Sequence, residues 1–331
     1  MTRLTLLLAA LLAATAPVLA DAPVKALTIA ARPIVNFAIG SSETRFGKLD
    51  FVGGLELTSD DDDLGALSAF RFLSPGRDFI GVADTGFWYT GRLDHDASGK
   101  PVGVSAFAMQ EMVDRDGAVI GKKWLTDAEG LSVDGARVTA SFERDHRVSE
   151  YALSATGMGA PKRDVPFLVP AGELRQNRGF ETIALSPKDG PLAGARVLVS
   201  EKSLDKKGDI FAAVIEGPKK GVFAVTRSGE FDITDGAFLP GGDLLLLERS
   251  YSMASGVKMR LRRFRSGDIG PGARIDGDIV MQADMAYQID NMEGLDVWTR
   301  ADGATMVSLI SDDNHSLLQR SLYLEFSLRD E

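Results

Sequence analysis

One short pattern recurs along this chain and constrains its fold more than any other feature. It consists of a polar or acidic residue, a nearby glycine, a short apolar strand, a turn, and a second strand that ends in polar residues. The copies begin at LGALSAF (64–70), DAEGLSV (127–133), RGFETIAL (178–185), TDGAFLP (234–240) and NMEGLDVW (291–298). Their spacing of about 50 to 65 residues is typical of radial arrays of strands rather than of helical repeats. The sequence therefore predicts an all-β fold, a β-propeller.

A glycine accompanies each copy near the start of the predicted inner strand. The innermost strand of a propeller blade lines the central channel, where neighbouring backbones lie close together. Glycine permits that approach because it has no Cβ. These glycines are Gly65, Gly130, Gly179, Gly236 and Gly294.

Strand counting gives five blades. The last blade has only three strands of its own, and the strand predicted at 49–57 supplies the missing outer strand and closes the ring. Six blades is the alternative, since residues 21–57 and 94–127 have room for further strands. The predicted organisation is a leader at 21–48 followed by a single propeller domain at 49–331.

Residues 1–20 have the features of a secretory signal peptide. They contain one arginine, an apolar run, and the small-residue pattern Val18-Leu19-Ala20. We therefore expect cleavage after Ala20 and export to the periplasm or out of the cell. The chain contains no cysteine, which excludes a disulfide framework, thiol catalysis and cysteine-ligated zinc.

The overall charge limits the choice of partner. The chain has 37 Lys and Arg against 47 Asp and Glu, a formal net charge of −10. A surface of this sign repels nucleic acid, and no stretch after residue 20 approaches the roughly 18 apolar residues of a membrane span. We expect a monomer whose ligand is a small ester or anion, with no nucleic-acid partner and no membrane span.

Carboxylates are expected to converge at the centre of the ring. Residues at the same point of every blade lie at equivalent positions around the axis. The acidic residues that end the predicted second strands are Asp84, Glu143, Glu201, Glu248 and Asp312.

Further carboxylates lie beside or near the inner-strand glycines: Glu129, Glu181, Glu293 and Asp296. Clustered carboxylates repel one another unless a cation or an arginine compensates. Oxygen ligands from several blades suit Ca²⁺, and the expected ligands are Glu129, Glu181, Glu293 and Asn314. The alternative is that these carboxylates pair with arginines or backbone N–H groups and hold the blades together.

Basic residues accompany these carboxylates in FERDHR, NRGFE, SEKS and LERS. A guanidinium group binds carboxylate or phosphate through two parallel hydrogen bonds. Strand neighbours point to opposite faces, so only one member of each acid–base dipeptide faces the channel, unless the strand has ended there. The candidates for anion or substrate binding are Arg144, Arg147, Arg178, Lys202, Arg249 and His315. The alternatives are salt bridges between blades and, for His315, a solvated loop.

Seven motifs occur in a fixed order, namely DAEGL, SFERDHR, RGFETIAL, VSEKS, LLLERS, NMEGLDV and SDDN. This series resembles the phytase-like domain family, the "esterase-like activity of phytase" proteins, over roughly residues 49–328. The resemblance implies a β-propeller with esterase or phosphoesterase activity. The acidic calcium motifs of the alkaline propeller phytases are not recognisable.

Two functions are consistent with these observations. The first is an exported, Ca²⁺-dependent hydrolase of an ester or phosphoester at the central mouth of the propeller. In this hydrolase Glu129, Glu181, Glu293 and Asp312 act on the cation or on water, while Arg144 and Arg249 stabilise the anion. The second is a non-catalytic periplasmic propeller that binds a small molecule or a partner protein at its mouth.

The absence of a G-x-S-x-G nucleophile elbow and of a P-loop disfavours a serine triad and a Walker-type nucleotide site.

Overall fold

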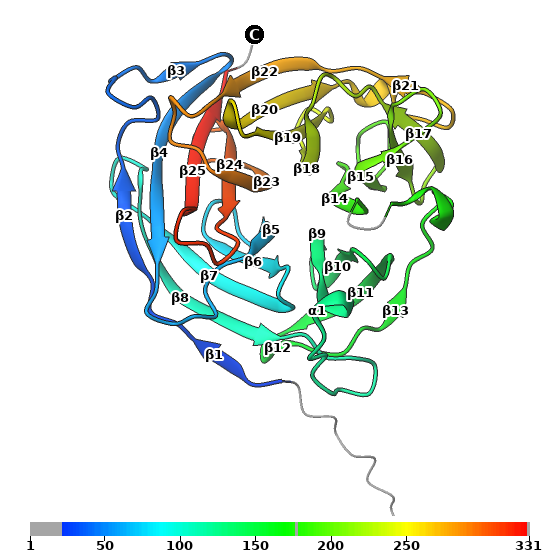
Figure 1. Cartoon of the computed structure of the whole chain (residues 1–331), viewed down its shortest axis with the longest axis horizontal. Helices are drawn as coiled ribbons and strands as arrows, with labels where there is room; N and C mark the ends of the chain where they lie inside the picture. Colours follow the sequence, from blue (N-terminus) through cyan, green and yellow to red (C-terminus); the bar gives the residue numbers. More distant parts are fainter. Residues whose placement is uncertain (1–21, 176–177, 330–331) are drawn as a thin grey trace, which may run out of the picture.

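Five sheets surround a central axis in the computed structural model, which describes residues 22–175 and 178–329 (Figure 1). The protein is a five-bladed β-propeller, as the repeat predicts. The predicted signal peptide at 1–20 lies outside the described residues. Within them, no helix is long and apolar enough to cross a membrane.

The strands of blades 1 and 2 are given from the axis outwards. Blade 1 contains β5 (Leu67–Phe72), β6 (Asp78–Ala83), β7 (Phe87–His95), β8 (Pro101–Glu111) and β1 (Val24–Ala26). Blade 2 contains β9 (Ala128–Asp134), β10 (Arg137–Phe142) and β11 (Arg147–Ser154), and the short strands β12 (Gly157–Met158) and β13 (Arg163–Asp164) both pair with β11.

The apolar segment DVPFLVP at 164–170 has the composition of an outer strand for blade 2, but it does not form one beyond its first residue. Only Asp164 belongs to a strand. Pro166 and Pro170 lack the N–H groups that a ladder needs. Val165 and Val169 are instead buried in a cluster that fills the space between blades 2 and 3.

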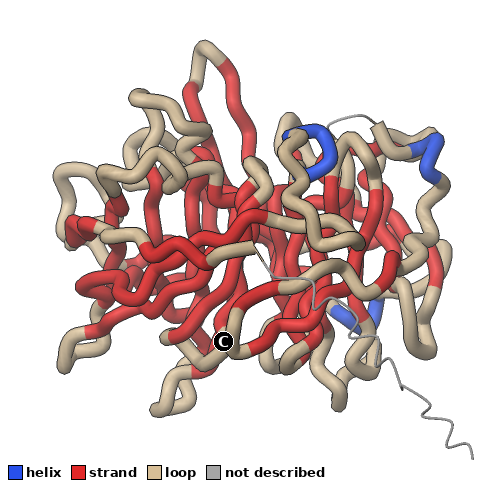
Figure 2. Tube along the Cα trace, turned by 90° about the horizontal axis from the view of Figure 1, so that it is seen from below, coloured by secondary structure: helices blue, strands red, loops and turns tan. Residues whose placement is uncertain are grey.

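Blades 3 and 4 are regular. Blade 3 contains β14 (Phe180–Leu185), β15 (Arg196–Leu204), β16 (Ile210–Val214), β17 (Gly221–Val225) and β21 (Arg274–Ile275). Blade 4 contains β18 (Asp232–Phe238), β19 (Leu244–Ser252), β20 (Gly256–Phe264) and β22 (Asp278–Ala283). The described helical segments are short connections, α1 (Lys123–Thr126), η1 (Ala171–Glu173) and η2 (Ser266–Asp268), and Figure 2 shows strands running between two loop-bearing faces.

Blade 5 closes the ring as predicted. Its strands are β23 (Asn291–Thr299), β24 (Thr305–Asp312), β25 (Ser321–Leu328), β4 (Leu49–Thr58) and β2 (Ala30–Ile34), and β3 (Arg45–Phe46) also pairs with β4. The N-terminal strand β4 pairs antiparallel with β25, from Leu57 opposite Ser321 to Leu49 opposite Leu328. The leader thus contributes strands to blades 1 and 5.

The cores lie between neighbouring blades. Leu245 and Leu247 of blade 4, for example, belong to the same buried cluster as Leu295 and Leu309 of blade 5. Burying a leucine side chain contributes about 1.5–3 kcal/mol, so apolar packing between blades holds the inner strands in place.

Each inner strand carries a bulge at the same point of its ladder. The register between the inner strand and the second strand shifts there in all five blades of the described chain. A bulge leaves a residue without a ladder partner and re-aims its side chain. The unpaired positions include Ser68, Glu129, Glu181, Thr234 and Glu293.

Candidate functional site

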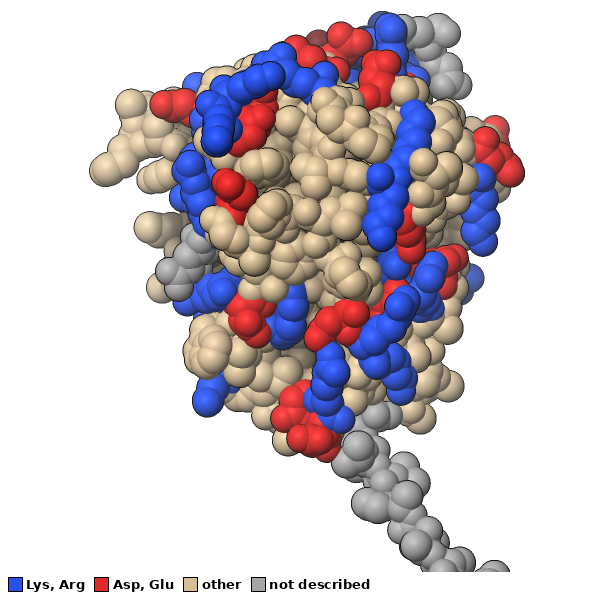
Figure 3. Space-filling model, turned by 90° about the vertical axis from the view of Figure 1, so that its right-hand side faces the viewer, with Lys and Arg blue, Asp and Glu red and all other residues tan. Residues whose placement is uncertain are grey.

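A polar cavity of about 310 Å³ opens at one end of the axis, and we call it the acid cavity. Among the described residues, eight carboxylates and three guanidinium groups line it. They are Asp84, Asp127, Glu129, Glu143, Glu181, Glu201, Glu293 and Asp312, with Arg144, Arg178 and Arg249; Ser68, Asn291 and Asn314 complete the lining. By contrast, Lys and Arg are mixed with Asp and Glu on the outer side formed by β17 and β21 (Figure 3).

Two positions in each blade supply most of this lining. The first is the bulge of the inner strand, which contributes Ser68, Glu129, Glu181 and Glu293. In blade 4 the bulge residue is Thr234, whose hydroxyl donates to the Met292 carbonyl at 3.0 Å.

The second position lies on the second strand. It is the residue directly after the one that pairs with the inner strand just before the bulge. It is held by Asp84, Glu143, Glu201, Arg249 and Asp312.

The prediction that Glu248 belongs to this ring is wrong. Glu248 pairs with Ile233, so Arg249 takes the ring position of blade 4. Neighbouring strand residues point to opposite faces, and Glu248 is buried inside its blade with Arg260 and Arg262.

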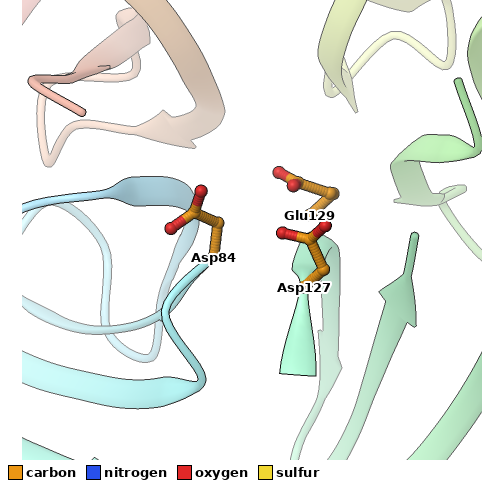
Figure 4. Close-up of side chains that lie close together, drawn as sticks. All are labelled: Asp84, Asp127 and Glu129. Atoms are coloured by element: carbon orange, nitrogen blue, oxygen red, sulfur yellow. The ribbon is translucent and has the colours of Figure 1, made fainter. Parts of the chain in front are cut away.

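Three carboxylates from blades 1 and 2 form a first triad, Asp84, Asp127 and Glu129, which face one another in Figure 4. One oxygen from each lies within 4.8 Å of the others. Lys123 Nζ lies 2.9 Å from Asp84, and Arg144 Nε lies 2.6 Å from Asp127. Burial, together with the neighbouring acidic groups, raises the pKa of Glu129 well above its usual range.

A second triad, Glu143, Glu181 and Glu201, comes from blades 2 and 3 and meets the same distance criterion. The Gly179 N–H donates to Glu143 at 2.6 Å, and one guanidinium nitrogen of Arg178 lies 3.0 Å from both carboxylate oxygens of Glu201.

Glu181 has no such basic partner. It is 8% exposed, its side chain hydrogen-bonds to the Glu143 carboxyl, and among the described residues no Lys or Arg forms an ion pair with it. Burial, with repulsion from neighbouring carboxylates, raises the pKa of Glu181 well above its usual range. Burial likewise raises the pKa of Glu143 to about 7.

A third group lies where blades 4 and 5 meet. Arg249 lies 3.1 Å from Glu293 and donates to the Asn291 amide oxygen. The Asn291 amide nitrogen donates to Glu293 at 2.9 Å and to Asp312 at 3.5 Å. Burial raises the pKa of Glu293 to about 8 and that of Asp312 to about 7.

A buried ion pair, the Arg71–Asp235 plug, closes the axis beyond the acid cavity. The two guanidinium terminal nitrogens of Arg71 donate to the two Asp235 oxygens at 2.7 and 2.8 Å. Arg71 also donates to carbonyls on four inner strands, those of Phe70, Ile183, Gly236 and Leu295.

Beyond the plug lies a separate cavity of about 410 Å³, lined by Arg71, Asp296 and Trp298 among others. Asp296, which the repeat placed beside an inner-strand glycine, faces this cavity and accepts hydrogen bonds from the Phe72 and Val297 N–H groups.

Sequence comparison identifies the family. A family model described as "Phytase-like: Esterase-like activity of phytase" matches residues 62–315. The chain belongs to this phytase-like family. No curated protein matches it.

Among solved structures, an endo-arabinase from Bacteroides thetaiotaomicron is 12% identical, with a TM-score of 0.50, over 82% of this chain and 96% of the arabinase. A protein of unknown function from Bacteroides caccae is 10% identical, with a TM-score of 0.33, over 72% of this chain and 68% of that chain. The arabinase likeness shows a shared fold and nothing about activity.

The acid cavity of this phytase-like propeller contains most of the residues selected from the sequence. They are Glu129, Glu181, Glu293, Asp312, Arg144, Arg178, Arg249 and Asn314. The four expected Ca²⁺ ligands do not form one group, however. Glu129 and Glu181 belong to different triads, Glu293 binds Arg249, and the Asn314 amide nitrogen donates to Gln319 at 3.3 Å.

Three selected residues do not line the acid cavity. The Arg147 guanidinium lies over the Phe142 ring, 3.7 Å from its centroid. Lys202 Nζ lies 2.7 Å from Asp232, outside the cavity. His315 sits in the turn after β24, where its backbone N–H donates to Asp313.

Sequence reasoning missed Asp127 and Ser68, and it did not select Asp84, Glu143 or Glu201 as site residues although it placed these three on the ring. The sequence signal that could have identified these residues is their position relative to the bulge. Aligned on Glu129 and Glu293, Asp127 and Asn291 stand at the same place, two residues earlier.

Proposed function

We propose that this phytase-like propeller is an exported, Ca²⁺-dependent hydrolase of an ester or phosphoester bond, with its reaction at the acid cavity. One observation carries the proposal: two carboxylate triads lie side by side with too few positive charges to neutralise them. Family membership supports a hydrolase, because the family description names an esterase-like activity. Export rests on the sequence features of residues 1–20.

The donor set fits Ca²⁺. Each triad offers three carboxylates, and Ca²⁺ takes six to eight oxygen ligands in flexible geometry, with water completing the set. Glu181 is the strongest indication, because a buried carboxylate that forms no ion pair and adjoins other carboxylates is costly unless a cation compensates it. Bound Ca²⁺ would supply Lewis acidity and neutralise charge that develops on the substrate.

The other cavity residues divide into two roles. Arg144 and Arg178 hold Asp127 and Glu201 and so orient one carboxylate of each triad. Arg249 faces the cavity beside Glu293 and is placed to bind the anionic oxygen of an ester or phosphoester.

Glu293 and Asp312 are the candidates for proton transfer. Their pKa values, about 8 and about 7, suit a group that gives or takes a proton near neutral pH. Asn291 donates to both and so fixes their orientation.

The decisive experiment is thermal unfolding of the mature protein in EDTA and then with added Ca²⁺, Mg²⁺ or Mn²⁺. A ligand that binds only the folded state stabilises it, by about 2.7 kcal/mol at one hundred times its Kd. We expect a Ca²⁺-dependent rise in Tm that Glu181→Gln reduces, because this variant removes one ligand of the second triad. Glu173→Gln, at an exposed carboxylate outside the cavity, is the matched control and should retain the full shift.

The cation-loaded protein is then assayed with p-nitrophenyl acetate, p-nitrophenyl phosphate and bis-p-nitrophenyl phosphate. Hydrolysis that EDTA and Glu181→Gln both reduce supports the proposal. No Tm shift with any cation and no hydrolysis would favour the alternative, a periplasmic propeller that binds a small molecule or a partner protein without catalysis.

A further inference from the structure

A groove of about 1010 Å³ adjoins the acid cavity and is roughly three times larger. The two share lining residues among those described, namely Arg178, Glu201, Arg249, Asn291 and Asn314. The groove is therefore a lateral extension of the acid cavity. Its far side is formed by the β19–β20 hairpin and by the loops that precede β23 and β25.

The outer edge of this groove is apolar and uncovered. Tyr251 from the hairpin, Met285 from the loop before β23 and Leu318 from the loop before β25 all line it. Tyr251 is 67% exposed and Leu318 is 93% exposed. Met253 at the hairpin tip and Leu317 are exposed beside them. Apolar side chains gathered from three separate segments form an edge of the kind that marks a binding surface.

Part of the groove lining is polar, and three of its charged groups pair with one another. Asp232 lies 2.7 Å from Lys202 Nζ and 2.9 Å from a guanidinium nitrogen of Arg227. The groove is therefore amphipathic, with polar groups towards the acid cavity and apolar groups towards its outer edge.

We infer that the substrate is an amphiphilic ester whose reacting group enters the acid cavity and whose larger apolar group lies along this groove, on Tyr251, Met285 and Leu318. The inference rests on the proposed hydrolase function and deepens it. A bond held at the carboxylates leaves about 310 Å³ for its surroundings, so a larger substituent must continue into the groove. Continuity of the lining favours this occupant over a partner protein or a membrane, neither of which needs access to the acid cavity.

The test compares short and long substrates. The pairs are p-nitrophenyl acetate with p-nitrophenyl octanoate, and methyl with octyl p-nitrophenyl phosphate. We expect the long member to be preferred, and the double variant Tyr251→Ser/Leu318→Ser to lower kcat/KM for it about tenfold while changing the short member less than about twofold. Val35→Ser/Ile39→Ser, which changes exposed apolar residues that do not line the groove, is the control.

Binding is measured separately from hydrolysis with the neutral fluorophore N-phenyl-1-naphthylamine. The groove variant should weaken its binding at least about fivefold, because apolar contact area is lost, while the control variant should not. Loss of binding without hydrolysis of any ester would retain the groove site and overturn the hydrolase.

Hydrolysis without chain-length preference, together with unchanged fluorophore binding, would overturn the groove site and retain the hydrolase. Sedimentation with phosphatidylcholine vesicles that Met253→Ser/Leu317→Ser abolishes, with fluorophore binding unchanged, would overturn the inference in favour of membrane contact.

Discussion

The Arg71–Asp235 plug and the acid cavity both place buried charges from several blades on the axis, but they balance those charges differently. In the plug one guanidinium meets one carboxylate, and the remaining guanidinium N–H groups donate to carbonyls of the inner strands. In the acid cavity the described lining has eight carboxylates for three guanidinium groups, and Glu181 forms no ion pair with a described Lys or Arg.

This difference in charge balance distinguishes a structural ion pair from a candidate binding site. A buried pair whose hydrogen bonds are satisfied is self-contained, and it fixes the relative positions of the strands that it joins. An excess of one charge in a buried site destabilises the fold. An excess that persists in a folded protein is explained if a ligand of opposite charge binds there, so we assign the plug to architecture and propose the acid cavity as a binding site.

Changing the pH sharpens this comparison most, because several carboxyls of the acid cavity titrate together. Their folded pKa values, about 7 for Asp312 and about 8 for Glu293, exceed the ordinary values of 3.8 and 4.5. Between these limits the folded state holds protons that the unfolded chain has released, so stability falls as the pH rises. Each such carboxyl lowers the free energy of unfolding by about 1.4 kcal/mol per pH unit between its unfolded and folded pKa values.

The measurement is urea unfolding in EDTA at pH 5, 6, 7 and 8. We expect the free energy of unfolding to decrease across this range and Ca²⁺ to restore part of it at pH 8. Constant or rising stability in EDTA would contradict the view that the cavity carboxylates are uncompensated.

Breaking the plug gives the next largest effect. Arg71→Met leaves Asp235 buried without its cation and should lower the free energy of unfolding by about 3–5 kcal/mol. Arg71→Met/Asp235→Asn should recover part of this loss, because the amide carries no charge. Arg77→Met, at an exposed site, should change stability by less than about 0.5 kcal/mol. A plug variant as stable as the control would show that the ion pair does not hold the inner strands.

The smallest effect has the opposite sign. In EDTA at pH 8, Glu181→Gln should raise the free energy of unfolding by about 1 kcal/mol, because one of three mutually repelling charges is removed. In saturating Ca²⁺ the same variant should be less stable than the natural protein. If Glu181→Gln destabilises the metal-free protein as well, the carboxylate serves the fold rather than a ligand.

The blade count, the closing strand and the central convergence of carboxylates followed from the repeat. The direction in which individual side chains point could not be predicted from the repeat. VSEK at 199–202 and LLER at 246–249 look alike. In blade 3, however, Ser200 is the residue that pairs with the inner strand just before the bulge, and in blade 4 that residue is Glu248. The two motifs are therefore offset by one residue, and that offset depends on the ladder register, which is not visible in the sequence.

Arg144 shows a second limit. It lines the cavity together with its neighbour Glu143 because β10 has ended at Phe142 and the chain turns through a left-handed conformation, with φ +57° at Arg144. The plug could not be predicted either, because Arg71 and Asp235 come from blades 1 and 4 and no local spacing connects them.

The seam between β4 and β25 also joins the two ends of the chain. The ribosome makes β4 long before β25, yet these two strands complete one sheet. The cavity residues run from Ser68 to Asn314, so the carboxylates of blade 5, Glu293 and Asp312, join those of blades 1 to 3 in a closed ring only when the two ends of the chain meet. Closing the ring must then overcome the repulsion among them, and we expect a cation present at that step to raise the rate of assembly as well as to stabilise the folded protein.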